Sequence, residues 1–303
     1  MIMENKIKKQ YYDRLTTLLD ANGKMFIDQY LEGSGKELEG KFWSENSSSR
    51  LAFDLYSWIA KEQSVLSFQF EKKLPGVICS KHGPAGVPNM DVYFETTNDR
   101  LFIESKYLEA ASLAYTNGEK PCLSKAYWYK GVYGNLEPKE RFYGREDIAK
   151  HFSGFCEKMQ KKINSIRKNE WKWFDVKQET CHLFGVIFYL LGAEYKNAQG
   201  VLKEQHLDKK VHLYNIIWRC EDDNFDINKE FLPFFFEEQA EQLVKDCIAP
   251  SVDFDFQIMT VQDLLKETDF YGLDFTKAKA FGLDCSLNEL MKQFDRNKKR
   301  GDY

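Results

Sequence analysis

Cysteines are too scattered in this sequence to build a disulfide framework or a metal-binding motif. The seven cysteines are odd in number, and no two of them form a Cys-x-x-Cys pair. Cys79 with His82, and Cys181 with His182, are too sparse for a zinc site. The pattern predicts free, buried thiols in a reducing compartment and therefore a cytoplasmic protein.

Long hydrophobic segments are also missing. The longest apolar stretch, Leu183 to Ala193, is too short to cross a bilayer. The first residues, Met1 to Lys6, open no signal-peptide hydrophobic region. We therefore expect neither export nor a membrane partner.

Two further absences restrict the function. The formal net charge is −4, so the chain is not a protein that coats nucleic acid electrostatically, and any such affinity must come from a local groove. No Gly-x-x-x-x-Gly-Lys-Ser/Thr motif is present, and the sequence therefore predicts no nucleotide site of that kind.

The sequence does contain enough apolar material for a large core. Over 303 residues it is 43% hydrophobic and 15% aromatic, which excludes a disordered chain. We expect a single domain over residues 1–303, with a core at about 40–260. Additional helices are expected at 1–39 and at 261–303.

The order of the expected elements predicts an α/β fold with a central mixed sheet flanked by helices. Strands are inferred from alternating apolar and polar residues, and helices from apolar residues at helical spacing. Strands are expected at 66–71, 90–95, 100–106, 183–191, 211–219 and 254–260. Helices are expected at 7–19, 24–31, from 47–49 onward, at 146–173 and at 261–267. Residues 107–145 are expected to form an insertion beside a cleft.

Two adjacent strand-like segments carry the most informative residues. Asp91 lies near the start of the first, Glu104 and Lys106 end the second, and turn-forming residues at 96–99 separate them. Because side chains alternate along a strand, Glu104 and Lys106 share one face. A connection with an even number of residues, 98–99 or 97–100, places Asp91 opposite Lys106 and diagonal to Glu104, whereas a one-residue slip would bury charge.

These residue types suit the hydrolysis of phosphodiester bonds. Carboxylate oxygens of Asp91 and Glu104 suit Mg²⁺ or Mn²⁺, whose remaining positions take water and a phosphate oxygen. A bound cation lowers the pKa of water and neutralises charge developing on the phosphate. Lys106 can orient or deprotonate the water, or stabilise the anion. The alternative is a surface salt bridge between Lys106 and either carboxylate.

The same residues resemble the signature of the PD-(D/E)XK superfamily, the restriction-endonuclease-like nucleases. Pro88 lies three residues before Asp91, rather than directly before it, and Glu104-Ser105-Lys106 follows. A serine-rich helix start at 47–49 and an aromatic segment at 124–128 make the sequence similar to a bacterial branch of that superfamily. The similarity covers residues 40–165.

The resemblance implies a restriction-endonuclease-like core and a Mg²⁺-dependent nuclease, with Asp91 and Glu104 as metal ligands and Lys106 as the catalytic lysine. Many members recruit a further carboxylate, and Glu71 is the first candidate for that role. In some relatives a glutamine on the helix after the motif supports the active site, and Gln160 is the candidate here.

DNA is the expected substrate, as for a restriction or defence endonuclease, and RNA is the second candidate. The sequence is compatible with a homodimer. A function of a different class is a catalytically silent nucleic-acid-binding or assembly module of the same fold. The intact Asp91, Glu104 and Lys106 argue against that alternative.

Overall fold

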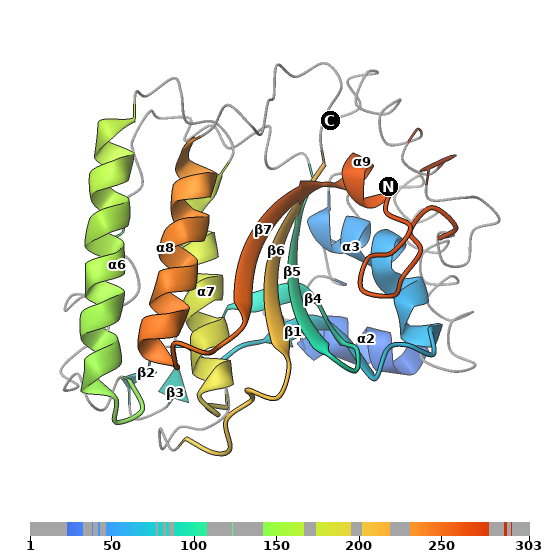
Figure 1. Ribbon diagram of the computed structural model, residues 1–303. Helices are drawn as coiled ribbons and strands as arrows, with labels where there is room; N and C mark the ends of the chain where they lie inside the picture. Colours follow the sequence, from blue (N-terminus) through green and yellow to red (C-terminus); the bar gives the residue numbers. More distant parts are fainter. Residues whose placement is uncertain are drawn as a thin grey trace.

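A five-stranded mixed sheet lies at the centre of the molecule and is covered by helices on both faces (Figure 1). The computed structural model describes residues 23–32, 47–76, 78–80, 83–84, 88–107, 142–166, 174–194, 202–218 and 231–278, with the single positions 38, 42, 123, 288, 289 and 292. The predicted α/β class, with a central mixed sheet between helices, is confirmed.

The sheet has an antiparallel part and a parallel part. Its strand order is β1-β4-β5-β6-β7. The strands are β1 (Ser67–Lys73), β4 (Asn89–Glu95), β5 (Asp99–Lys106), β6 (Lys210–Ile217) and β7 (Phe254–Thr260). β1, β4 and β5 pair antiparallel, whereas β5, β6 and β7 pair parallel. A separate small sheet joins β2 (Ile78–Ser80) to β3 (Gly83–Pro84).

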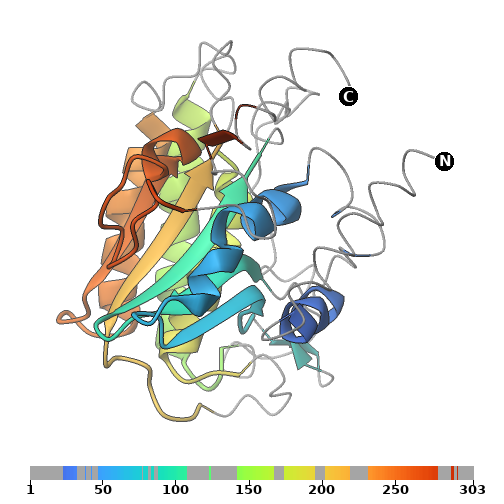
Figure 2. The same cartoon turned by 90° about the vertical axis from the view of Figure 1, so that its right-hand side faces the viewer.

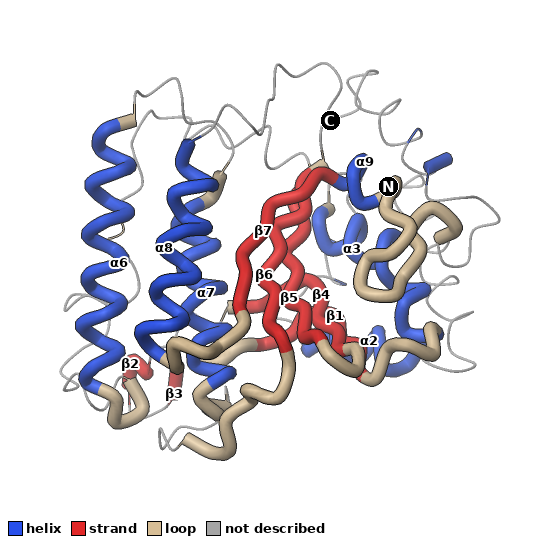
Figure 3. The backbone as a smooth tube through the Cα atoms, viewed as in Figure 1, coloured by secondary structure: helices blue, strands red, loops and turns tan. Residues whose placement is uncertain are grey.

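Two helical layers enclose the sheet, and each buries its own hydrophobic cluster. One layer holds α6 (Glu146–Ser165), α7 (Val176–Leu190) and α8 (Phe231–Cys247), packed against Tyr93 and Phe102 of the sheet. The other holds α2 (Gly23–Glu32), α3 (Ser48–Tyr56), the 3-10 helix η4 (Ser57–Lys61) and α9 (Val261–Leu264), packed against Val92 and Ile103. Figure 2 shows α2 and α3 in front of the sheet, and Figure 3 shows the helices on either side of it.

Most of the predicted elements that fall on described residues are confirmed. All the predicted strands except one are present, and α2, α3 and α6 begin at or near the expected residues. Ser47 caps α3 as expected, because its hydroxyl accepts a hydrogen bond from the Arg50 N–H at 3.1 Å. α9 is shorter than predicted, and α8 was not predicted. The expected helix at 7–19 and most of 107–145 and 279–303 lie outside the described residues.

The strand predicted at 183–191 is wrong, since these residues belong to α7. Asp175 caps this helix by accepting a hydrogen bond from the Gln178 N–H at 3.0 Å. The apolar run lies between the sheet and the neighbouring helices, so it is buried on most of its surface. A fully buried helix and a fully buried strand have the same continuous apolar pattern, and periodicity cannot separate them.

α7 approaches the start of β4 closely at a glycine. A Cβ atom at Gly185 would lie 2.6 Å from Pro88 Cγ and 2.8 Å from Leu74 Cβ. Only a residue without a side chain permits this spacing. The middle of α7 is thereby held beside the start of the strand that carries Asp91. Within the described residues, no helix combines the length and the hydropathy needed to span a membrane.

Candidate functional site

The β4–β5 hairpin brings Asp91 beside Glu104. Glu95 pairs with Arg100 across the turn, and Val92 pairs with Ile103. The connection therefore has an even number of residues, 96–99, as expected. The predicted pairing of Asp91 with Lys106 is wrong by two residues, because Thr96 closes the turn early. Its hydroxyl accepts from the Asp99 N–H at 3.1 Å, and its own N–H donates to the Asp99 carbonyl at 2.9 Å.

A backbone hydrogen bond fixes the carboxylate of Asp91. The Ser105 N–H donates to Asp91 Oδ2 at 2.7 Å. Since Ser105 lies between Glu104 and Lys106, this bond holds Asp91 next to both. The structure thus brings together the three residues on which the sequence prediction depends. We call Asp91, Glu104 and Lys106 the carboxylate site.

Glu104 is held mainly through one of its two oxygens. Its Oε1 accepts from Lys106 Nζ at 2.6 Å and from Gln178 Nε2, on α7, at 2.7 Å. Its Oε2 is buried and has no hydrogen bond to the residues that the structure describes; His182 Nε2 lies 3.6 Å away. Glu104 and Lys106 are only 3% and 9% exposed, so their ion pair is not the surface salt bridge of the alternative interpretation.

The electrostatics of Asp91 disfavour its charged form. Burial is the main reason that the pKa of this carboxyl lies well above its usual range, and the nearby charges of Glu104 and Glu71 raise the pKa further. Lys106 and the Ser105 N–H lower it, but they do not compensate fully. Negative charge is therefore crowded at this point, and a bound cation would relieve it.

Glu71 reaches the carboxylate site through a strained backbone. It lies between the paired positions Phe70 and Lys72 of β1, at the level of Asp91, and has a φ of 50°. This left-handed conformation interrupts the alternation of side chains along β1. Phe70 packs in the layer of Val92, whereas Lys72 Nζ lies 4.7 Å from the centre of the Tyr93 ring, on the other face of the sheet. The buried Glu71 carboxylate accepts a hydrogen bond from Asn89 Nδ2 at 3.4 Å.

A glutamine other than the predicted Gln160 contacts Glu104. Gln160, on α6, accepts from the Leu123 N–H at 2.8 Å and donates to Asn164 at 3.1 Å. Gln178 instead reaches Glu104 from the first turn of α7. Asp175 followed by Gln178 is an N-terminal helix signal that identifies this position, but the strand predicted just after it obscured the helix.

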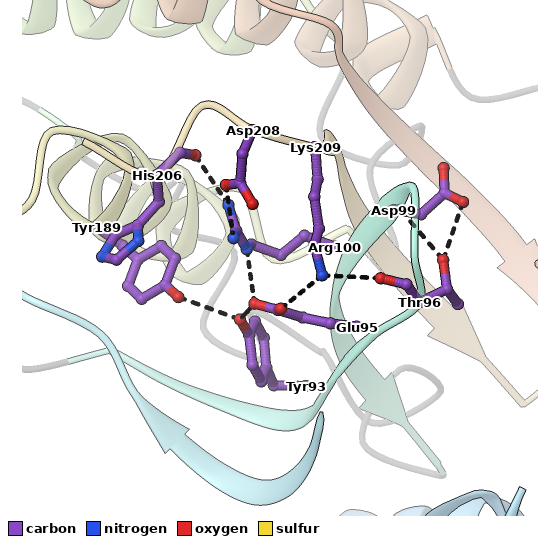
Figure 4. A network of polar contacts seen from close by, with 9 residues as sticks. All are labelled: Tyr93, Glu95, Thr96, Asp99, Arg100, Tyr189, His206, Asp208 and Lys209. Atoms are coloured by element: carbon purple, nitrogen blue, oxygen red, sulfur yellow. Dashed lines mark hydrogen bonds and ion pairs between the residues drawn. The ribbon is translucent and has the colours of Figure 1, made fainter. Parts of the chain in front are cut away.

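A second polar cluster lies at the other end of the same hairpin (Figure 4). We call it the turn network; it comprises Tyr93, Glu95, Arg100, Tyr189, His206, Asp208 and Lys209. The buried guanidinium of Arg100 donates to Glu95 Oε1 at 2.8 Å and to Asp208 Oδ1 at 3.1 Å. Lys209 Nζ donates to Glu95 Oε2 and to the Thr96 carbonyl, both at 2.8 Å. A cavity of about 630 Å³ borders this network.

The charged residues around that cavity neutralise one another. Asp208 pairs with Arg100, Lys209 pairs with Glu95, and Lys210 pairs with Asp253 at 3.2 Å. Although burial opposes it, hydrogen bonds from Lys209, Tyr93 and Arg100 lower the pKa of Glu95 to about 2. The charges of the turn network are therefore already paired within the protein.

Two carboxylates of the carboxylate site are suited to a divalent cation. Among the residues that the structure describes, no group of three or more His, Cys, Asp or Glu side chains is arranged to hold a metal ion. A cation held by Asp91 and Glu104 would therefore need water or phosphate oxygens to complete its coordination, as Mg²⁺ usually does in proteins.

We found no match to this chain among protein-family models, curated proteins or solved structures. Function is therefore inferred from the geometry of the carboxylate site.

Proposed function

We propose that this protein is a Mg²⁺-dependent nuclease of the PD-(D/E)XK type, which hydrolyses phosphodiester bonds in DNA. The observation that carries the proposal is the convergence of Asp91, Glu104 and Lys106 at one end of the β4–β5 hairpin. The crowding of carboxylates there, with Glu71 close by, is what a cation site requires.

The architecture supports the proposal. The hairpin lies in the middle of a mixed sheet with helices on both faces, which is the arrangement expected of a restriction-endonuclease-like core. Asp91 and Glu104 lie on neighbouring strands, and Lys106 follows Glu104 on the same face of β5.

Each residue has a distinct role in this proposal. Asp91 and Glu104 hold the cation, and the buried Oε2 of Glu104, which has no hydrogen bond, fits a metal-binding atom. The cation, when bound, supplies positive charge at the phosphate and lowers the pKa of a water. Lys106 orients that water or stabilises the developing anion, because its ammonium group is fixed 2.6 Å from Glu104 Oε1.

A cleavage assay tests the proposal directly. Purified protein is incubated with plasmid DNA, or with RNA, in Mg²⁺, Mn²⁺ or EDTA. We expect DNA cleavage with either metal and none in EDTA. Lys106→Ala should lower the rate by about 10²–10⁴-fold while the protein stays folded.

Lys210→Ala is the matched control. Lys210 lies on the adjacent strand with an exposed side chain, and its surface pair with Asp253 contributes little. Its substitution should leave the rate unchanged. Nucleic-acid binding without cleavage, unaltered by Asp91→Ala, would instead identify a catalytically silent module, and preferential cleavage of RNA would change the substrate class.

A further inference from the structure

A second set of buried polar residues, from β6 and α7, lies next to Glu104. Asn215 of β6 is the register partner of Glu104 in the parallel β5–β6 pair. α7 covers this part of the sheet with Glu179 and His182. Glu179, His182 and Asn215 are 0%, 2% and 2% exposed, so the group is closed to solvent. We call these three residues the inner cluster.

The inner cluster is linked to Glu104 through His182. Asn215 Nδ2 donates to Glu179 Oε1 at 2.7 Å. The other oxygen of Glu179 lies 3.9 Å from His182 Nδ1, and His182 Nε2 lies 3.6 Å from Glu104 Oε2. The imidazole therefore lies between two carboxylates, one in the inner cluster and one in the carboxylate site.

Stability alone does not account for this arrangement. Within the described part of the chain, three buried atoms of this cluster have no hydrogen bond, which is costly in a protein interior: Glu179 Oε2, His182 Nδ1 and Asn215 Oδ1. The neighbouring residues of α7, Leu183 and Val186, are fully buried and apolar. Apolar residues at 179 and 182 would pack there at a lower cost. A role in orienting Glu104 explains the polar residues.

We propose that His182 and Glu179 are positioning residues for Glu104, an inference that rests on the proposed metal-dependent function. Lys106 and Gln178 hold Glu104 Oε1, and His182 lies against Oε2. Glu179, which Asn215 anchors to the sheet, fixes the imidazole from its other side. Residues of this kind behind a metal ligand set its orientation and its affinity.

Two substitutions that keep the shape of the interior test the proposal. Glu179→Gln keeps an oxygen for Asn215 and removes the charge facing His182. His182→Phe keeps a ring and removes both nitrogens. Thr180→Val is the matched control, because Thr180 is fully buried on the same helix and its hydroxyl bonds only to its own helix at Val176 O, 2.6 Å away.

The main measurement is the Kd of the protein for Mn²⁺ alone, determined by electron paramagnetic resonance. Thermal unfolding and cleavage kinetics are measured in parallel. Glu179→Gln and His182→Phe should raise the Kd for Mn²⁺ by about 10–100-fold. They should lower kcat while KM for DNA stays within about twofold, because the change lies behind the metal ligand and not at the DNA surface. Thr180→Val should bind Mn²⁺ like the wild type.

Asp91→Asn separates the two proposals. If Asp91→Asn binds Mn²⁺ as tightly as the wild type, both the metal site and the positioning role are overturned. If it loses Mn²⁺ while Glu179→Gln and His182→Phe keep wild-type affinity, only the positioning role is overturned. If either Glu179→Gln or His182→Phe fails to fold, the Mn²⁺ affinity of the other variant decides the test. Failure of both to fold would assign these residues a structural role instead.

Discussion

The two ends of the β4–β5 hairpin carry similar residues in opposite electrostatic states. At the turn network, Glu95 receives hydrogen bonds from Arg100 and Lys209, and its pKa falls to about 2. At the carboxylate site, burial and neighbouring carboxylates raise the pKa of Asp91. Paired charge at one end is typical of a structural role, whereas crowded carboxylates at the other are what the proposed metal site requires.

The largest effect on stability should come from Arg100→Leu. Arg100 is buried and donates to the largely buried Glu95, to the His206 carbonyl and to the exposed Asp208, so its loss removes one of the cations that bind Glu95. We expect the free energy of unfolding to fall by about 3–5 kcal/mol, measured by urea denaturation. Arg145→Leu is the control, because the Arg145–Asp147 pair is much more exposed. Arg145→Leu should lower the free energy of unfolding by less than about 1 kcal/mol. Equal losses would show that Arg100 contributes no more to stability than a surface ion pair does.

Asp91→Asn should act in the opposite direction. Asparagine retains an oxygen for the Ser105 N–H but removes a buried negative charge close to Glu104 and Glu71. In EDTA at neutral pH, the free energy of unfolding should rise by on the order of 1 kcal/mol. Cleavage should be lost in the same variant. A loss of stability comparable with that of Arg100→Leu would show that Asp91 is part of the structural framework.

The smallest effect is a difference in acid sensitivity. The pKa of Glu95 is about 2 in the folded protein and 4.5 without its partners, so its contribution to stability is present above pH 4.5. That contribution is lost as the pH falls through 2. In urea denaturation between pH 5 and pH 2, the free energy of unfolding should therefore fall less steeply with decreasing pH for Glu95→Gln than for the wild type. Glu204→Gln, at an exposed position, should follow the wild-type profile.

The sequence predicted the hairpin because alternation specifies which side chains share a face. Glu104 and Lys106 are two residues apart on one strand, and no other part of the chain is needed to align them. The position of Asp91 depended in addition on the turn. Thr96 and Asp99 close a turn centred one residue earlier than expected, which shifts the register by two residues, and the hydroxyl contacts that decide this are specific to one turn geometry.

The parts that the sequence did not predict depend on contacts between distant segments. Residues 183–191 have the pattern of a strand because a buried helix has no polar face, and without the helix Gln178 and His182 cannot be placed beside Glu104. The contribution of Glu71 depends on a left-handed backbone, which no residue type other than glycine signals in a sequence.

Gly185 determines how closely α7 packs against the start of β4. The residue touches no group of the carboxylate site, yet it sets how near α7 lies to Pro88 and hence to the strand of Asp91. A methyl group there would act as a wedge between two segments that are distant in sequence. If the protein is the proposed nuclease, we expect a substitution at Gly185 to lower its activity from a position outside the carboxylate site.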